Sequence, residues 1–96
     1  MIARVTTLSV QQGKLDDVVR FARNALQVIK REEQFRGYYG LADRQANKYV
    51  VILLWETEAD LEVFLQSPFH RENSATLLAL LAEPPNVETY EVAVHS

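Results

Sequence analysis

Seven consecutive apolar residues, YVVILLW at Tyr49–Trp55, form the longest fully apolar run in the chain. The run is far shorter than the roughly 20 residues that a membrane-spanning helix needs, and its β-branched residues favour a strand. A strand with one face in water alternates apolar and polar residues, and this run does not alternate. We therefore expect both faces of this strand to be buried.

The first half of the chain predicts a strand, a helix and a second strand. Ile2–Val10 is rich in the β-branched residues that strands favour. From Leu15 onward, apolar residues recur at the three- and four-residue spacing of an amphipathic helix, which is expected to fade around Glu33 and Gln34. Phe35–Asp43 then predicts a strand, joined to the apolar strand by the turn RQANK.

The second half predicts the apolar strand, a helix in two pieces and a last strand. The apolar strand is expected to run from Tyr49 to Glu56, and Thr57 is the expected N-cap of the helix after it. Ser67–Pro68 should interrupt this helix, because proline lacks an N–H donor and disfavours helical geometry in the residue before it. After EPPN, the alternating segment Val87–Val94 predicts the last strand.

This order of elements, β-α-β-β-α-β, predicts one α+β domain over residues 1–96 with the ferredoxin-like plan: an antiparallel sheet with both helices on one face. Because the helices can cover only one face, the other face of the doubly apolar strand needs a different cover. A chain of 96 residues predicts a single domain, so a second copy is the simplest cover. We therefore expect a homodimer.

Composition excludes several classes of chemistry. The chain has no cysteine, which excludes disulfides, thiolate nucleophiles and cysteine-ligated metals and makes a reducing cytoplasm the expected compartment. The N-terminus does not resemble a signal peptide. A net charge of −3 and the lack of an aromatic-interleaved basic patch argue against nucleic acid as a partner. The sequence has no phosphate loop, dinucleotide fingerprint or clustered histidines, so neither a cofactor nor a metal is expected.

Three segments resemble one known family. LWETEADLEVFLQSPFHRE (Leu54–Glu72) has a Trp-Glu-Thr-Glu step leaving the strand and a later Ser-Pro-x-His segment, with FRGYYGL before it and PPNVETYEV after it. Together they resemble the antibiotic biosynthesis monooxygenase (ABM) family over about residues 2–94. The resemblance implies a dimeric α+β barrel, in which two ferredoxin-like domains pack sheet to sheet.

The resemblance implies more than one activity, because the ABM family includes cofactor-free oxygenases of polycyclic phenols and quinols, haem-degrading oxygenases and small proteins of unknown role. The positions that match the Asn, Trp and His of the haem-degrading branch hold Thr6, Phe64 and Ser74, so haem degradation is not expected. In the aromatic-polyketide branch, the Trp position is matched by Trp55. The Asn and Tyr positions of that branch hold other residues here, namely Val51 and Leu61, and its Arg position falls near Ser74 or Ala75.

Two functions follow from these matches. The leading prediction is a cofactor-independent ABM-type monooxygenase acting on a small aromatic or quinol substrate in a cleft between helices and sheet. An electron-rich phenolate can reduce O₂ itself, so the protein needs only an apolar cleft, a base and hydrogen-bond donors. The alternative is a non-catalytic small-molecule-binding or stress-associated dimer of the same fold, which the unmatched positions favour.

Two residues are predicted to be catalytic. His70 titrates near neutral pH and follows the helix break at Pro68, where a side chain can point into a cleft. The alternative is a surface histidine that only bonds the backbone. Trp55 is predicted to lie over a flat aromatic substrate, and the alternative is packing at the end of the strand.

Four further residues are predicted to bind substrate: Tyr38, Tyr39, Phe64 and Arg4. Tyr38 and Tyr39 are adjacent in a strand and so face opposite sides of the sheet, one toward the helices and one toward the dimer face. Phe64 and the helix-facing tyrosine are expected to line the wall of the cleft. Arg4 lies on a core face of the first strand and needs a carboxylate or a ligand anion, for which Glu91 is a plausible internal partner.

Overall fold

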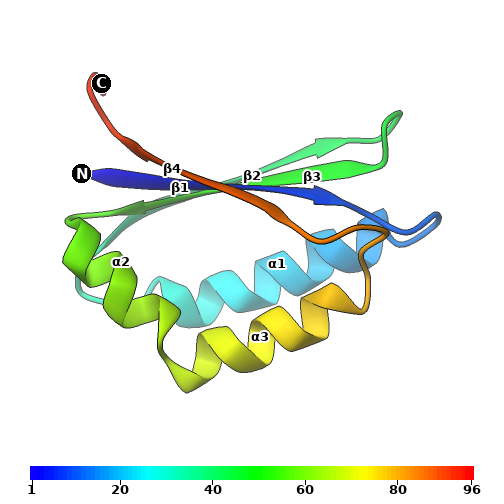
Figure 1. The fold of residues 1–96 in the computed structure, drawn as a ribbon, viewed down its shortest axis with the longest axis horizontal. Helices are drawn as coiled ribbons and strands as arrows, with labels where there is room; N and C mark the ends of the chain where they lie inside the picture. The colour runs from blue at the N-terminus through cyan, green and yellow to red at the C-terminus, as the bar shows by residue number, and fades with distance from the viewer.

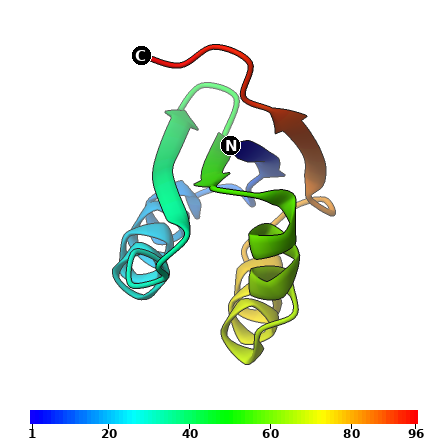
Figure 2. The same ribbon diagram turned by 90° about the vertical axis from the view of Figure 1, so that its left-hand side faces the viewer.

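The seven elements follow the predicted order in the computed structural model, which describes residues 1–96. They are β1 (Ile2–Ser9), α1 (Leu15–Ile29), β2 (Phe35–Asp43), β3 (Lys48–Trp55), α2 (Glu58–Leu65), α3 (Pro68–Leu78) and β4 (Asn86–Glu91). All three helices lie on one side of the four-stranded sheet, and the other side carries no helix (Figures 1 and 2). The α+β ferredoxin-like prediction is confirmed. No helix has the length and apolar character needed to cross a membrane.

The apolar strand β3 occupies a central position, because the strand order is β2-β3-β1-β4 and every pairing is antiparallel. Its alternate residues Tyr49, Leu53 and Trp55 are buried under the helices. The residues between them, Val50, Ile52 and Leu54, point to the side without helices and are half-buried. Both faces of this strand are thus apolar, as the run of seven residues predicts.

The helix break has the predicted cause. Thr57 caps α2 by accepting a hydrogen bond from the backbone N–H of Asp60 at 3.2 Å. Ser67 caps α3 by accepting from the backbone N–H of His70 at 3.2 Å, and Pro68 follows it in the first turn of α3. Proline fits there because the first N–H groups of a helix have no partner inside the helix. The break therefore ends α2 and places His70 in the first turn of α3.

Two predicted boundaries are wrong by three residues or more, and tertiary contacts explain both. α1 ends at Ile29, the last buried residue of its apolar stripe, rather than near Glu33. β4 ends at Glu91 rather than Val94, because its partner β1 begins opposite that residue, where Ile2 pairs with Glu91. Val94 has no strand beside it and is 92% exposed.

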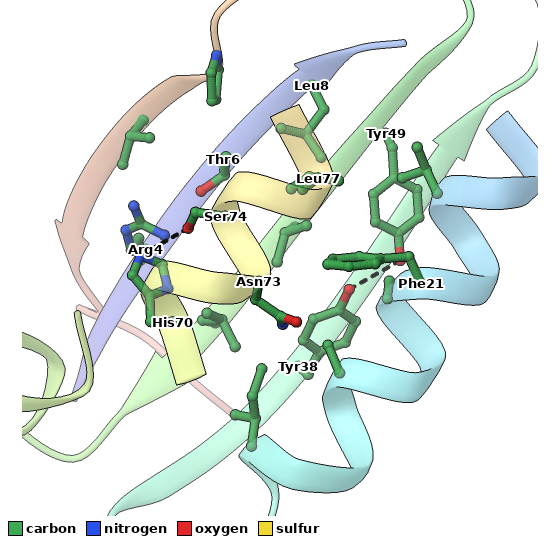
Figure 3. Close-up of a pocket in the computed structure, with 18 of the residues that line it drawn as sticks. Arg4, Thr6, Leu8, Phe21, Tyr38, Tyr49, His70, Asn73, Ser74 and Leu77 are labelled. Atoms are coloured by element: carbon green, nitrogen blue, oxygen red, sulfur yellow. Dashed lines mark hydrogen bonds between the residues drawn. The ribbon is translucent and has the colours of Figure 1, made fainter. Parts of the chain in front are cut away.

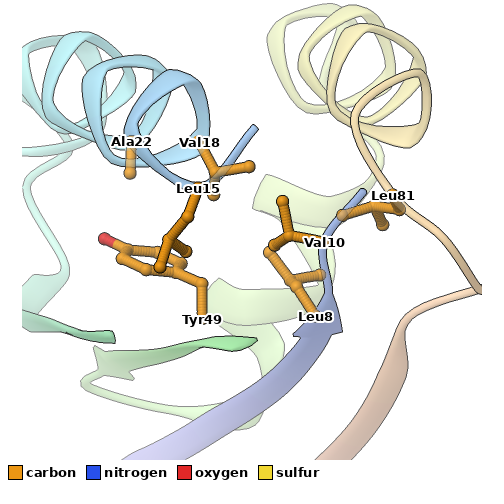
Figure 4. Close-up of a cluster of buried hydrophobic side chains, with 7 residues drawn as sticks. All are labelled: Leu8, Val10, Leu15, Val18, Ala22, Tyr49 and Leu81. Atoms are coloured by element: carbon orange, nitrogen blue, oxygen red, sulfur yellow. The ribbon is translucent and has the colours of Figure 1, made fainter. Parts of the chain in front are cut away.

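The core divides into two clusters along the sheet. One lies under the start of α1 and contains Leu8, Val10, Leu15, Val18, Ala22, Tyr49 and Leu81 (Figure 4). The other contains Ile29, Leu53, Trp55, Leu61 and Phe64 at the opposite end. In the second cluster, Trp55 is 2% exposed, and its ring lies 5.9 Å from that of Phe35 and 4.9 Å from that of Phe64.

Candidate functional site

A cavity of about 330 Å³ lies between the sheet and the helices, with parts of both core clusters in its walls (Figure 3). Of its 20 lining residues 14 are hydrophobic, and none is Asp or Glu. This size is at the lower end of the range for small-molecule sites, which are mostly apolar with a few placed polar groups. The cavity therefore suits a small, largely apolar ligand.

The strand register builds the floor of the cavity in rows. Arg4, Leu53 and Tyr38 lie opposite one another across β1, β3 and β2. The next helix-facing row is Thr6, Val51 and Gly40. Neighbouring strands are about 4.8 Å apart, so Arg4 and Tyr38 stand on opposite sides of the floor, separated by two strand spacings.

The roof comes from one face of α3 together with α1 and the end of α2. Four lining residues of α3 are spaced three and four apart, which places them on one helix face: His70, Asn73, Ser74 and Leu77. Phe21 of α1 and Phe64 of α2 add aromatic rings to the wall. Asn73 and Ser74 were not among the predicted site residues, although their spacing from His70 is visible in the sequence.

His70 lies in the cavity wall, where a neutral imidazole is favoured. It is half-buried, its Nε2 lies 3.3 Å from Ser74 Oγ, and its ring centroid lies 5.3 Å from that of Phe64. Burial lowers the pKa of His70 below its ordinary value of 6.5, and the positive charge of Arg4 lowers it further. At neutral pH this imidazole is therefore uncharged and can accept a proton.

Arg4 lies at the same end of the cavity as His70 (Figure 3). The predicted partner Glu91 is wrong, because Arg4 is opposite Thr89 in the register and forms no ion pair with any carboxylate. Burial lowers the pKa of Arg4, but an arginine side chain stays protonated in proteins. The site thus contains a half-buried cation without a counterion.

A pair of phenols occupies the other side of the cavity. Tyr38 and Tyr49 are joined by a hydrogen bond of 3.0 Å between their hydroxyls, and burial raises the pKa of Tyr38. One hydroxyl donates to the other, so the accepting hydroxyl keeps its own proton free for a ligand oxygen. The sequence predicts Tyr49 only as part of the apolar strand, since nothing in it distinguishes Tyr49 from a purely apolar core residue.

Two predicted site residues lie outside this cavity. Tyr39 is 59% exposed on the face without helices, because its neighbour Tyr38 takes the helix-facing position. Trp55 is buried beneath Phe64 and does not line the cavity, so its location agrees with the packing alternative. The other predicted residues, Arg4, Tyr38, Phe64 and His70, all line it.

Gly40 makes room for the phenol pair, because a Cβ there would lie only 2.7 Å from Cζ of Tyr49 and closer still to its hydroxyl. We expect Gly40→Ala to lower the free energy of unfolding by about 1–3 kcal/mol, the usual cost of overpacking a core. The cost should shrink in a Tyr49→Phe background, which lacks the closest atom. Urea unfolding of the four variants of this cycle measures both values. An equal cost in both backgrounds would contradict the assignment.

Comparisons with known proteins agree with this architecture. The family model for antibiotic biosynthesis monooxygenase matches residues 1–75. The solved structure of SnoaB, a cofactor-independent oxygenase from Streptomyces nogalater, is 18% identical with a TM-score of 0.86, over 98% of this chain and 94% of that chain. A protein of unknown function from Nitrosomonas europaea is 21% identical with a TM-score of 0.85, over 99% and 91%. No curated protein matches the sequence significantly.

At these identities the solved structures establish the fold alone. The family model covers residues 1–75 of the 96, and these include β1, both tyrosines of the phenol pair and the first turns of α3. The resemblance carried by the Trp-Glu-Thr-Glu step and the Ser-Pro-x-His segment is thereby confirmed, and the chain belongs to the antibiotic biosynthesis monooxygenase family.

Proposed function

We propose that this protein is a cofactor-independent monooxygenase that oxidises a small aromatic phenol or quinol bound in the cavity. The observation that carries the proposal is the place of His70 in the wall of an apolar cavity, where burial and the positive charge of Arg4 lower its pKa. A general base works best when it is uncharged at the operating pH and lies within reach of the substrate proton.

The chain's own residues have distinct roles in this reaction. His70 accepts the proton of the substrate hydroxyl, and Ser74, 3.3 Å away, orients the imidazole. The resulting phenolate is electron-rich enough to reduce O₂, and Arg4 stabilises its negative charge. One oxygen atom replaces a ring hydrogen and becomes a carbonyl, and the other leaves as water with that hydrogen and the proton returned by His70. A phenol and O₂ thus give a quinone and water, with all electrons supplied by the substrate.

The apolar walls support the same chemistry. Phe21, Phe64 and Leu77 offer surfaces against which a flat ring can pack. Water is disfavoured in such a lining, and exclusion of water strengthens the interaction between a phenolate and Arg4. The free hydroxyl proton of the tyrosine pair can hold a second oxygen of the substrate.

A non-catalytic small-molecule-binding protein is the second candidate. Val51, which lines the cavity, favours this second candidate. It stands at the position where the aromatic-polyketide oxygenase branch has Asn. Oxygen uptake by chelator-treated protein, measured with naphthols, anthrones and quinols, separates the two functions. The proposal predicts substrate-dependent O₂ consumption, and binding without O₂ consumption would identify a binding protein instead.

We also propose that the face of the sheet without helices packs on a second copy of the chain. Its central residues are apolar, and two more large side chains on it, Tyr39 and Leu41, are 59% and 50% exposed in the single chain. An exposed apolar face of a sheet is an interaction surface or an aggregation liability. Homodimer interfaces of this kind commonly bury about 2,000 Å² or more in total.

Sedimentation is expected to show a dimer at micromolar concentration. Ile52→Lys places a charge in the centre of this face and is expected to give a folded monomer, because a buried unpaired charge is strongly unfavourable in an apolar interface. Val63→Lys is the matched control, since Val63 lies on α2 and is 73% exposed. A wild-type monomer, or an Ile52→Lys variant that remains dimeric, would contradict the proposed interface.

A further inference from the structure

The charges around the cavity do not balance. Arg4 is the only permanently charged residue in the lining, and no Asp or Glu accompanies it. In the proposed reaction His70 takes up a proton and becomes a second cation beside Arg4. A phenolate supplies only one negative charge against these two positive charges, so one positive charge is left uncompensated in a mostly apolar cavity.

Arg4 also lacks partners in the free protein. None of its guanidinium nitrogens has a carboxylate within ion-pair distance, and no side-chain hydrogen bond joins it to Ser74 or to its strand neighbour Thr6. The Thr6 side chain points into the same end of the cavity (Figure 3). A guanidinium binds carboxylates through two parallel hydrogen bonds, and this one is free to do so.

We propose that the substrate is an aromatic acid whose carboxylate pairs with Arg4 while its hydroxyl reaches His70. Because Arg4 and His70 lie at the same end of the cavity, the carboxylate and the hydroxyl belong to the same end of the ring system. The apolar remainder then extends over Leu53 and Val51 toward the phenol pair. The inference of a hydroxyl on the substrate rests on the proposed function, whereas the inference of a carboxylate rests only on Arg4.

The test is a binding titration without O₂, so that no turnover is needed. The ligands are hydroxynaphthoate, the neutral hydroxynaphthamide of nearly the same shape, and naphthol. Wild-type protein is expected to bind the acid about 10–100-fold more tightly than the amide, the usual worth of a charge-assisted pair. Arg4→Gln should remove this preference by weakening the acid alone, and Arg4→Lys should keep part of it.

Arg71→Gln is the control for long-range charge. Arg71 follows His70 on α3, is exposed, lies outside the cavity lining and forms no ion pair. It is expected to leave all three affinities unchanged.

Arg4→Met should raise the midpoint of thermal unfolding, because this substitution replaces an uncompensated cation by an apolar group. This variant keeps the test informative if Arg4→Gln folds poorly.

Each outcome decides the proposal. Equal affinity of wild-type protein for the acid and the amide would overturn it, and so would an Arg4→Gln variant that loses the same factor for all three ligands. Tighter binding of the acid than of the amide, with no O₂ uptake when O₂ is then added, would support the carboxylate site and refute the monooxygenase. Failure of the carboxylate site and failure of the monooxygenase are therefore distinguishable.

Discussion

His70→Ala is expected to lower kcat for a phenol or quinol substrate by about 10²–10⁴-fold, the usual contribution of a general base. The side chain is half-buried in the cavity wall and contacts Ser74 and Phe64 without being part of either core cluster. Oxygen consumption measures the loss, and thermal unfolding should show a folded protein. Full activity in a folded His70→Ala variant would remove the base from the mechanism.

The pH profile distinguishes a base from a residue that only positions substrate. The imidazole accepts a proton only when neutral, and its pKa is held below 6.5 by burial and by Arg4. Wild-type kcat/KM should therefore be constant around neutral pH and fall as the pH decreases through this lowered value. The inflection should disappear in His70→Ala. In Arg4→Gln it should move upward, because the positive charge that lowers the pKa is gone.

Trp55→Ala is expected to lower the free energy of unfolding by about 3–5 kcal/mol, as removal of a large buried aromatic side chain does. Trp55 is 2% exposed between Phe35 and Phe64 and closes the end of the core opposite the start of α1. Denaturant unfolding followed by circular dichroism measures the loss. For a domain of 96 residues, this is a large part of the total stability.

Trp55→Phe is the matched variant and should cost much less. The indole N–H of Trp55 is buried without a hydrogen-bond partner, so phenylalanine removes an unsatisfied donor while keeping a ring between Phe35 and Phe64. A Trp55→Ala variant with nearly wild-type stability and much weaker naphthol binding would instead make Trp55 a platform for substrate.

The fold was predictable because its signals are local or nearly so. The run Tyr49–Trp55 identifies a central strand, and the cap at Thr57 and the proline break at Ser67–Pro68 divide the second helical segment at the right place. The end of β4 was not predictable in this way, since it depends on where β1 begins in the opposing strand. The same register excludes Glu91 as the partner of Arg4, and no pattern within either strand reveals it.

The candidate site was predictable only where a residue is unusual for its position. Arg4 in a core strand and His70 after a helix break are such residues. Tyr49 is not, because its role depends on Tyr38 in the neighbouring strand and on the space left by Gly40. Trp55 is chemically suited to stacking, but only the packing of α2 against the sheet places Phe64 between Trp55 and the cavity.

The most direct test of the monooxygenase is turnover with isotope-labelled O₂ by protein freed of metals with a chelator. The proposed reaction predicts that a hydroxynaphthoate or quinol substrate gains one labelled oxygen atom in its quinone product and that the second labelled atom appears in water. Uptake of O₂ should match product formation and depend on His70. Tight binding of these ligands with neither O₂ uptake nor label in the ligand would contradict the proposed monooxygenase activity.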